Sequence, residues 1–75
     1  MTPKTAIDLQ RVAYNLLYIG LDYGSISRAI IAEASDFGGA SLSQAEIYSI
    51  YLEADRAFMA GHTLDEAFPL ERIEA

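Results

Sequence analysis

The chain of 75 residues has no cysteine, no tryptophan and only one histidine. Without cysteine it cannot use disulfide bonds or a thiolate-bound zinc ion, which stabilise many domains of this size. The fold must therefore be stabilised by packing alone or by association. Because folding hides only about 60% of the surface of so short a chain, we expect a thin core.

The residues needed for common kinds of catalysis are also scarce. Hydrolysis by a serine or a cysteine needs a nucleophile, a base and an orienting group within reach of one another. The lone His62 directly follows Gly61, where it is better explained as part of a helix end than as a base. Gly38 and Gly39 are not followed by the Lys-Ser or Lys-Thr pair of a phosphate-binding loop. We therefore predict a non-enzymatic protein with no catalytic residue, no metal site and no cofactor.

Basic residues are few as well, with 5 against 11 acidic residues and a net charge of -6. Proteins that bind phosphate backbones need clustered lysine or arginine. Direct binding of nucleic acid is therefore not expected. A helix-turn-helix motif is also not expected, because the helix at 43–60, which would have to enter the DNA groove, is acidic. No apolar run approaches the roughly 20 residues of a membrane span, and the first residues lack the order of a signal peptide. We predict a cytoplasmic protein without membrane contact.

What the sequence does contain is apolar residues at helical spacing along most of its length. They predict an all-α fold, a compact three-helix bundle with a short fourth helical turn near the carboxyl end. The whole chain, residues 1–75, is expected to form one domain. The predicted helices cover residues 3–19, 25–37, 43–60 and 63–68, and residues 69–75 form either a frayed turn or a disordered tail.

Capping signals mark the starts of two of these helices. Ser43 and Glu46 have the spacing of a capping box, in which each side chain accepts a hydrogen bond from the backbone of the other residue. Thr63 and Glu66 repeat that spacing. The start of the second helix is less marked, because Ser25 or Asp22 could cap it, and Ser25 is the predicted cap.

Glycines mark the ends of the predicted helices. Gly20 and Gly61 can take the left-handed conformation that ends a helix. Gly38 and Gly39 are predicted to end the second helix. Pro69 limits the fourth helical turn, because proline disfavours helical geometry in the residue before it.

Apolar residues make up 52% of the chain, more than so small a body can bury. The helix at 43–60 has a broad main face, formed by Ile47, Ile50, Tyr51, Ala54, Ala57 and Phe58. A second stripe of Tyr48, Leu52 and Met59 follows its flank, and Asp55 lies between the two. Asp55 is then a solvated charge, an acceptor for a tyrosine hydroxyl, or an acceptor for a partner's arginine.

The helix at 3–19 repeats this arrangement. Its main face is formed by Leu9, Val12, Ala13, Leu16 and Ile19, and its second stripe by Ile7, Tyr14 and Tyr18. Such stripes can be covered within a bundle, because each long helix contacts two neighbours. Alternatively they form an exposed surface rich in tyrosine and methionine, which interfaces favour. The predicted partner-binding residues are Tyr14, Tyr18, Tyr48, Leu52, Asp55 and Met59.

These features predict a small acidic regulator or inhibitor that binds another protein, or forms a homodimer, through its exposed stripes. Its size and charge are typical of proteins carried by phages or mobile elements. The alternative is an antagonist of the anti-CRISPR or antirestriction kind, whose acidic surface blocks a nucleic-acid-binding site. That surface would include Asp65, Glu66, Glu71 and Glu74. The two differ in their expected response to salt, since screening weakens a charge-driven complex.

The segment LSQAEIYSIYLEAD, residues 42–55, resembles the central helix of the Hha family of small nucleoid-associated modulators. The residues that carry the resemblance are Leu42, Ser43, Glu46, Ile47, Tyr51, Ala54 and Asp55. It implies a helical protein that binds the oligomerisation domain of H-NS-type proteins, with the acid at Asp55 in the contact. The segment before residue 42 is longer and much less basic here than in that family.

Overall fold

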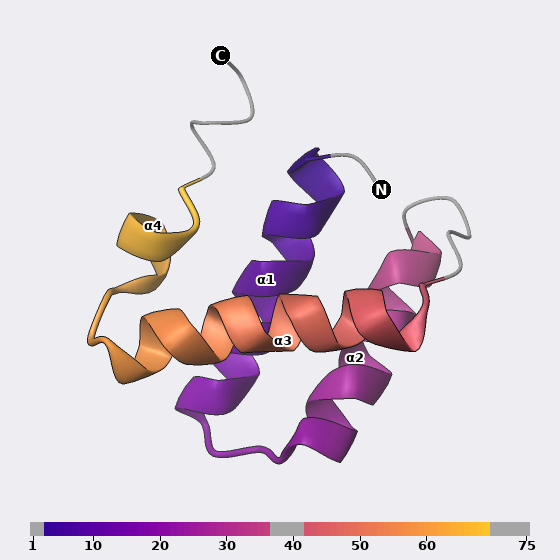
Figure 1. Ribbon diagram of the computed structural model, residues 1–75, viewed down its shortest axis with the longest axis horizontal. Helices are drawn as coiled ribbons and strands as arrows, with labels where there is room; N and C mark the ends of the chain where they lie inside the picture. Colours follow the sequence, from indigo (N-terminus) through magenta and orange to yellow (C-terminus); the bar gives the residue numbers. More distant parts are fainter. Residues whose placement is uncertain (1–2, 37–41, 70–75) are drawn as a thin grey trace.

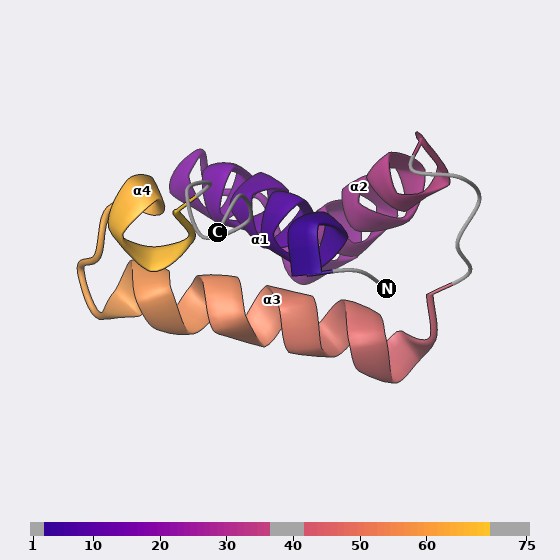
Figure 2. The ribbon, with the colours of Figure 1, turned by 90° about the horizontal axis from the view of Figure 1, so that it is seen from above.

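The computed structural model describes residues 3–36 and 42–69, which contain four helices and no strand. They are α1 (Pro3–Tyr18), α2 (Tyr23–Asp36), α3 (Gln44–Met59) and α4 (Leu64–Ala67). Figure 1 shows α3 lying across α1 and α2, and Figure 2 shows α1 and α2 in one layer with α3 in the other. The short α4 lies beside the carboxyl end of α3. The predicted all-α bundle is confirmed.

The core lies where α3 crosses the other two long helices. Its largest fully buried side chains are Leu9, Ile26, Ile30 and Ile47. The complete set of buried apolar residues is Leu9, Ala13, Tyr14, Ile26, Ile30, Ala34, Ile47, Ile50, Ala54 and Phe68. The main faces predicted for the long helices therefore point inward. Ile19 is an exception at 68% exposure, because α1 ends at Tyr18 and Ile19 lies in the turn that follows.

The predicted capping box of α3 is confirmed. The Ser43 side chain accepts a hydrogen bond from the Glu46 N–H at 3.1 Å, and the Glu46 carboxylate accepts one from the Ser43 N–H at 3.0 Å. Leu42, just before the cap, packs against the core that includes Ile47. This pair fixes the direction in which the chain enters α3.

Glycine ends both α1 and α3, as predicted. Gly20 has a φ of 93° and Gly61 a φ of 82°, which are left-handed values that favour glycine. Beyond Gly20 the Leu21 N–H donates to the Leu16 carbonyl at 3.0 Å. The equivalent hydrogen bond, from an N–H to the carbonyl five positions earlier, forms after Gly61 and satisfies a carbonyl of the last turn of α3. The predicted stop at residues 38 and 39, and Phe37 before it, lie outside the described residues.

The predicted cap of α2 is wrong by one helical turn. The Ser25 N–H donates to Oδ1 of Asp22 at 2.9 Å, so Asp22 is the capping residue. The Ile26 N–H donates to the Asp22 carbonyl at 3.0 Å, which is the first bond of the helical ladder. With its cap at Asp22, α2 begins at Tyr23 and gains an aromatic side chain in its first turn.

Candidate interaction surface

The second stripe of α1 is largely covered by the protein itself. Tyr14, predicted to be exposed, is only 9% exposed. Its ring packs edge-to-face on Phe58 and on Phe68, with centroid distances of 5.9 and 6.3 Å. Its hydroxyl donates a hydrogen bond to the carbonyl oxygen of His62. The prediction that Tyr14 lies on an exposed surface is therefore wrong, because the segment carrying α4 folds back over this flank.

Local chemistry gives α4 its short length and its position. Thr63 and Glu66 form the predicted capping box, with hydrogen bonds of 3.2 and 2.9 Å. Phe68 leaves the helix with a φ of -133° and a ψ of 64°, as expected for a residue followed by Pro69. This ending places the Phe68 ring in the core at 6% exposure. The described part of the predicted tail 69–75 is Pro69 alone.

Arg11 joins α1 to the segment of α4, and the sequence analysis missed it. Its guanidinium donates to the carbonyl oxygen of Phe68 at 2.8 Å and pairs with the Asp65 carboxylate at 3.0 Å. The Arg11 side chain is 19% exposed, while that of Asp65 is 87% exposed. The bond to the carbonyl is therefore the better shielded of the two. These residues are more than 50 positions apart, so no local sequence signal connects them.

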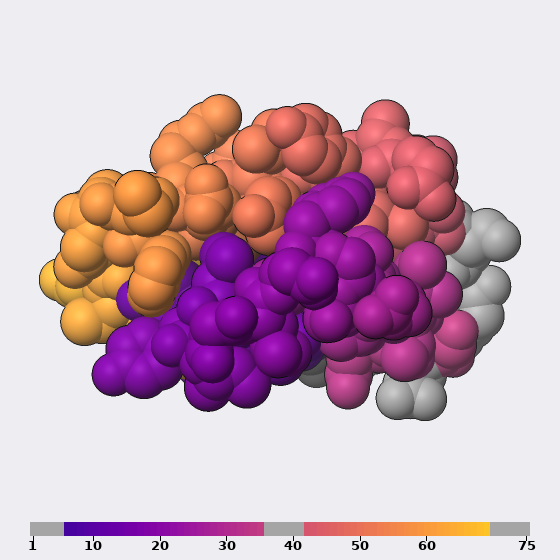
Figure 3. Space-filling view, turned by 90° about the horizontal axis from the view of Figure 1, so that it is seen from below, coloured from indigo at the N-terminus to yellow at the C-terminus, as the bar shows by residue number. Residues whose placement is uncertain are grey.

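The second stripe of α3 is not covered in the same way. Tyr48 is 50% exposed and Met59 76% exposed, while Leu52 and Asp55 between them are half-buried. The residues Tyr18, Tyr48, Leu52, Asp55 and Met59 are called the tyrosine face below. Figure 3 shows α3 lying along the end of α1 and the start of α2.

Tyr18 belongs to the tyrosine face although it lies on α1. It is 74% exposed, and its ring packs edge-to-face on Phe58 of α3 at 6.5 Å. Phe58 belongs to the main face of α3, so the exposed end of α1 packs against that helix. Of the six predicted partner-binding residues, the structure leaves Tyr18, Tyr48 and Met59 exposed and Leu52 and Asp55 half-buried. Their role in binding stays a prediction.

Three tyrosines form a second feature that the sequence analysis missed, called here the tyrosine cluster. Tyr23 of α2 packs edge-to-face on Tyr48 at 5.9 Å and on Tyr51 at 4.8 Å. The rings of Tyr48 and Tyr51 lie 6.4 Å apart at an angle of 22°. The cluster depends on α2 starting at Tyr23, so assigning the cap to Asp22 would have placed Tyr23 on a helix.

The charges beside this surface are mainly negative. Asp22 is next to Tyr23 in the chain, and its pKa is lowered by hydrogen bonds from the Ser25 backbone and side chain and, to a lesser extent, by the charge of Arg28. Within the described residues, Asp55 has no ion-pair partner closer than 4.0 Å. A cation that approached the tyrosine face could therefore pair with the Asp55 carboxylate.

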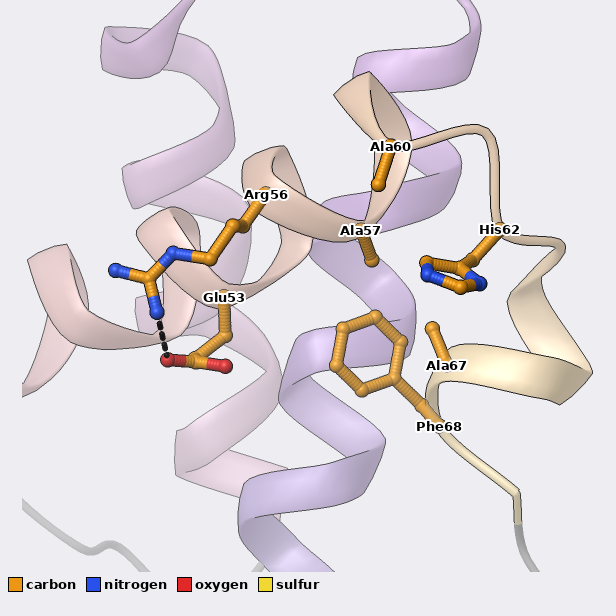
Figure 4. A pocket seen from close by; sticks show the side chains of 7 residues that line it. All are labelled: Glu53, Arg56, Ala57, Ala60, His62, Ala67 and Phe68. Atoms are coloured by element: carbon orange, nitrogen blue, oxygen red, sulfur yellow. Dashed lines mark hydrogen bonds and ion pairs between the residues drawn. The ribbon is translucent and has the colours of Figure 1, made fainter.

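A pocket of about 390 Å³ opens on the other side of α3, between that helix and α4 (Figure 4). It is lined by Glu53, Arg56, Ala57, Ala60, His62, Ala67 and Phe68. Glu53 and Arg56 pair with each other at 3.3 Å, and no serine or cysteine nucleophile lines the pocket beside His62. The pocket can accept a small apolar group, but its residues do not form an acid-base or nucleophilic pair.

Within residues 3–36 and 42–69, no three histidine or acidic side chains lie close enough together to hold a metal ion. In the same part of the chain no helix has the length and apolar character needed to cross a bilayer.

No protein-family model, curated protein or solved structure matches the chain. The resemblance of residues 42–55 to the Hha family therefore gains no support from the rest of the sequence.

Proposed function

We propose that the protein is a non-enzymatic interaction module that regulates or inhibits a partner protein by binding it through the tyrosine face. The observation that carries the proposal is the exposure of Tyr18, Tyr48 and Met59, between 50 and 76%. Isolated exposed apolar residues are normal. A group of tyrosine, leucine and methionine on one flank has instead the composition that interfaces favour.

The acidic antagonist remains a second candidate, but the described acids support it less well. Asp22, Glu46 and Glu66 accept backbone hydrogen bonds at the starts of three helices. Glu53 and Asp65 pair with arginines of the same chain. These five acids therefore already have partners within the chain, and Glu71 and Glu74 lie outside the described residues.

The proposal is tested by capturing partners from the native host with the wild-type protein and with Tyr48→Ala plus Leu52→Ala. We expect the double variant to lose the captured protein, and the wild-type complex to persist at about 0.5 M salt, where the Debye length is only a few ångströms. Ile31→Ala is the matched control, because Ile31 is an exposed apolar residue of α2 at 47% exposure. The control variant should retain the partner.

Other results would contradict the proposal. A complex that the double variant retains, and that dissociates steeply with salt, would favour the acidic antagonist. A concentration-dependent dimer that captures no other protein would favour self-association. Urea unfolding of the double variant must show a folded protein, so that loss of binding is not loss of the fold.

A further inference from the structure

The tyrosine cluster suggests which chemistry the partner presents, and this inference rests on the proposed function. Tyr23 stands perpendicular to Tyr48 and Tyr51, at interplanar angles of 81° and 77°. Tyr48 is 50% exposed, so part of its ring is open to a partner. The short distance of 4.8 Å between Tyr23 and Tyr51 means that the cluster is a filled platform rather than a cage with an open centre.

Such a platform favours a cation. The face of an aromatic ring carries partial negative charge, and a guanidinium group placed over it is attracted within about 6 Å of the ring centre. Among the tyrosines, Tyr14 alone donates its hydroxyl to another described residue. Each hydroxyl of the cluster has lone pairs that can accept a hydrogen bond from a ligand.

The neighbouring charges point in the same direction. Asp22 adjoins Tyr23, and Asp55 lies two helical turns beyond Tyr48 on the same flank of α3. Arg28 of α2 hydrogen-bonds the neutral Ser25 hydroxyl at 3.4 Å and keeps its charge, which acts mainly on Asp22. Asp55, which has no ion-pair partner within the described residues, is therefore the acid that best complements a positively charged group on the platform.

A second copy of this chain fits the platform less well. Arg11 of α1 and Arg56 of α3 already pair with acids of the same chain. The net charge of -6 also opposes the approach of an identical chain. Arginine suits the site better than lysine, because its planar guanidinium can stack on a ring while donating hydrogen bonds at its edge.

We propose that the cluster of Tyr23, Tyr48 and Tyr51 is the contact point for an arginine on an apolar segment of the partner protein. The arginine stacks on the exposed part of Tyr48, with Asp22 and Asp55 supplying complementary charge. Leucine-like side chains beside it pack on Leu52 and Met59. The cation determines which apolar segments bind, and the apolar contacts supply most of the affinity.

The test uses short synthetic amphipathic helices with leucines and one central arginine on the apolar face, and neutral polar residues elsewhere. The matched peptide carries citrulline, which keeps the shape of arginine without its charge. Affinities for the full chain are measured by NMR shift titration, on the wild type and on Tyr48→Phe, Tyr48→Leu and Ile31→Ala. Because exposed cation–π contacts are weak, we expect the arginine peptide to bind about two- to five-fold more tightly than the citrulline peptide.

The variants make the test specific. Tyr48→Leu should remove the preference for arginine while Tyr48→Phe and Ile31→Ala keep it. Equal binding of both peptides at the tyrosine face would overturn the arginine inference and leave the proposed function standing. If neither peptide shifts the signals of this face, both proposals lose support. A dimer of the free protein with Tyr48 in its interface would overturn the inference in favour of a second copy.

Discussion

The two long helices α1 and α3 carry similar second stripes, and the structure treats them differently. On α1 the stripe is covered at Tyr14, which is 9% exposed beneath the segment that carries α4, whereas Tyr18 at the end of the helix is 74% exposed. On α3 the stripe remains open, with Tyr48 at 50% and Met59 at 76% exposure. The same sequence pattern thus serves the core in one place and a surface in the other.

The position of α4 explains the difference. The chain reverses at Gly61 and reaches α4 within a few residues, so α4 can cover just one flank of α3. It covers the flank of Ala57 and Ala60, where the pocket of Figure 4 lies. Helical spacing places Tyr48 and Met59 on a different flank of α3. Within residues 3–36 and 42–69, the short fourth helix covers one stripe and leaves the stripe of Tyr48 and Met59 open.

The largest expected effect comes from removing the cover. Phe68→Ala deletes a ring that is 6% exposed and packs on Tyr14. We expect a loss of about 3 to 5 kcal/mol in the free energy of unfolding, because a buried ring is lost and a cavity remains. Urea unfolding followed by circular dichroism measures this loss.

A loss of that size could unfold so small a domain, since native proteins are stable by roughly 5 to 15 kcal/mol. Phe68→Leu is therefore the companion variant, with an expected loss below about 1.5 kcal/mol. If Phe68→Ala cost less than about 1 kcal/mol, α4 would not be an essential cover, and the contrast between the two flanks would fail.

The sequence predicted those features that depend on neighbouring residues. The capping box of Ser43 and Glu46 and the helix end at Gly61 involve contacts within one turn, so their chemistry can be read from spacing. The burial of Tyr14 could not be predicted in this way. It depends on His62 and Phe68, which approach from 48 and 54 positions further along the chain. The periodicity of α1 alone is the same whether or not that segment folds back.

The tyrosine cluster was missed for a related reason. Periodicity places Tyr51 on the main face of its helix and leaves Tyr23 before the predicted start of the second helix, so no sequence pattern connects the two residues. Their contact follows from the angle at which α2 meets α3, which a helical periodicity does not specify. A cap at Asp22 is the one local signal that would have put Tyr23 on a helix.

A smaller effect is expected from the cap of α4. The pKa of Glu66 is lowered from its ordinary value of 4.5, first by the hydrogen bond from the Thr63 backbone and then by the one from its hydroxyl. A carboxylate with a lowered pKa stabilises the fold above its unfolded pKa, and that stability is lost as the pH falls through the folded pKa. Glu66→Gln should therefore be less stable than the wild type at neutral pH. The two proteins should converge in acid.

Glu46→Gln provides the matched control, because Glu46 makes the same cap on α3 and its pKa is lowered for the same reasons. Unfolding curves measured between neutral pH and about pH 3 compare the variants over the range in which glutamate titrates. The environment of Tyr14, followed by NMR, should respond to Glu66→Gln more than to Glu46→Gln. An equal response would mean that the cap of α4 does not help to hold the cover in place.

The smallest effect is expected on the open flank, from Met59→Ala. Because Met59 is 76% exposed, the truncation removes little buried surface, and exposed substitutions usually change stability by no more than about 0.5 kcal/mol. The measurement is urea unfolding at two protein concentrations. A loss above about 1 kcal/mol that grows with concentration would mean that a second copy covers this flank. If this flank is open, the stability of Met59→Ala is unchanged at both concentrations and its binding of a partner is weaker. This result would preserve the contrast with Phe68, whose flank is covered.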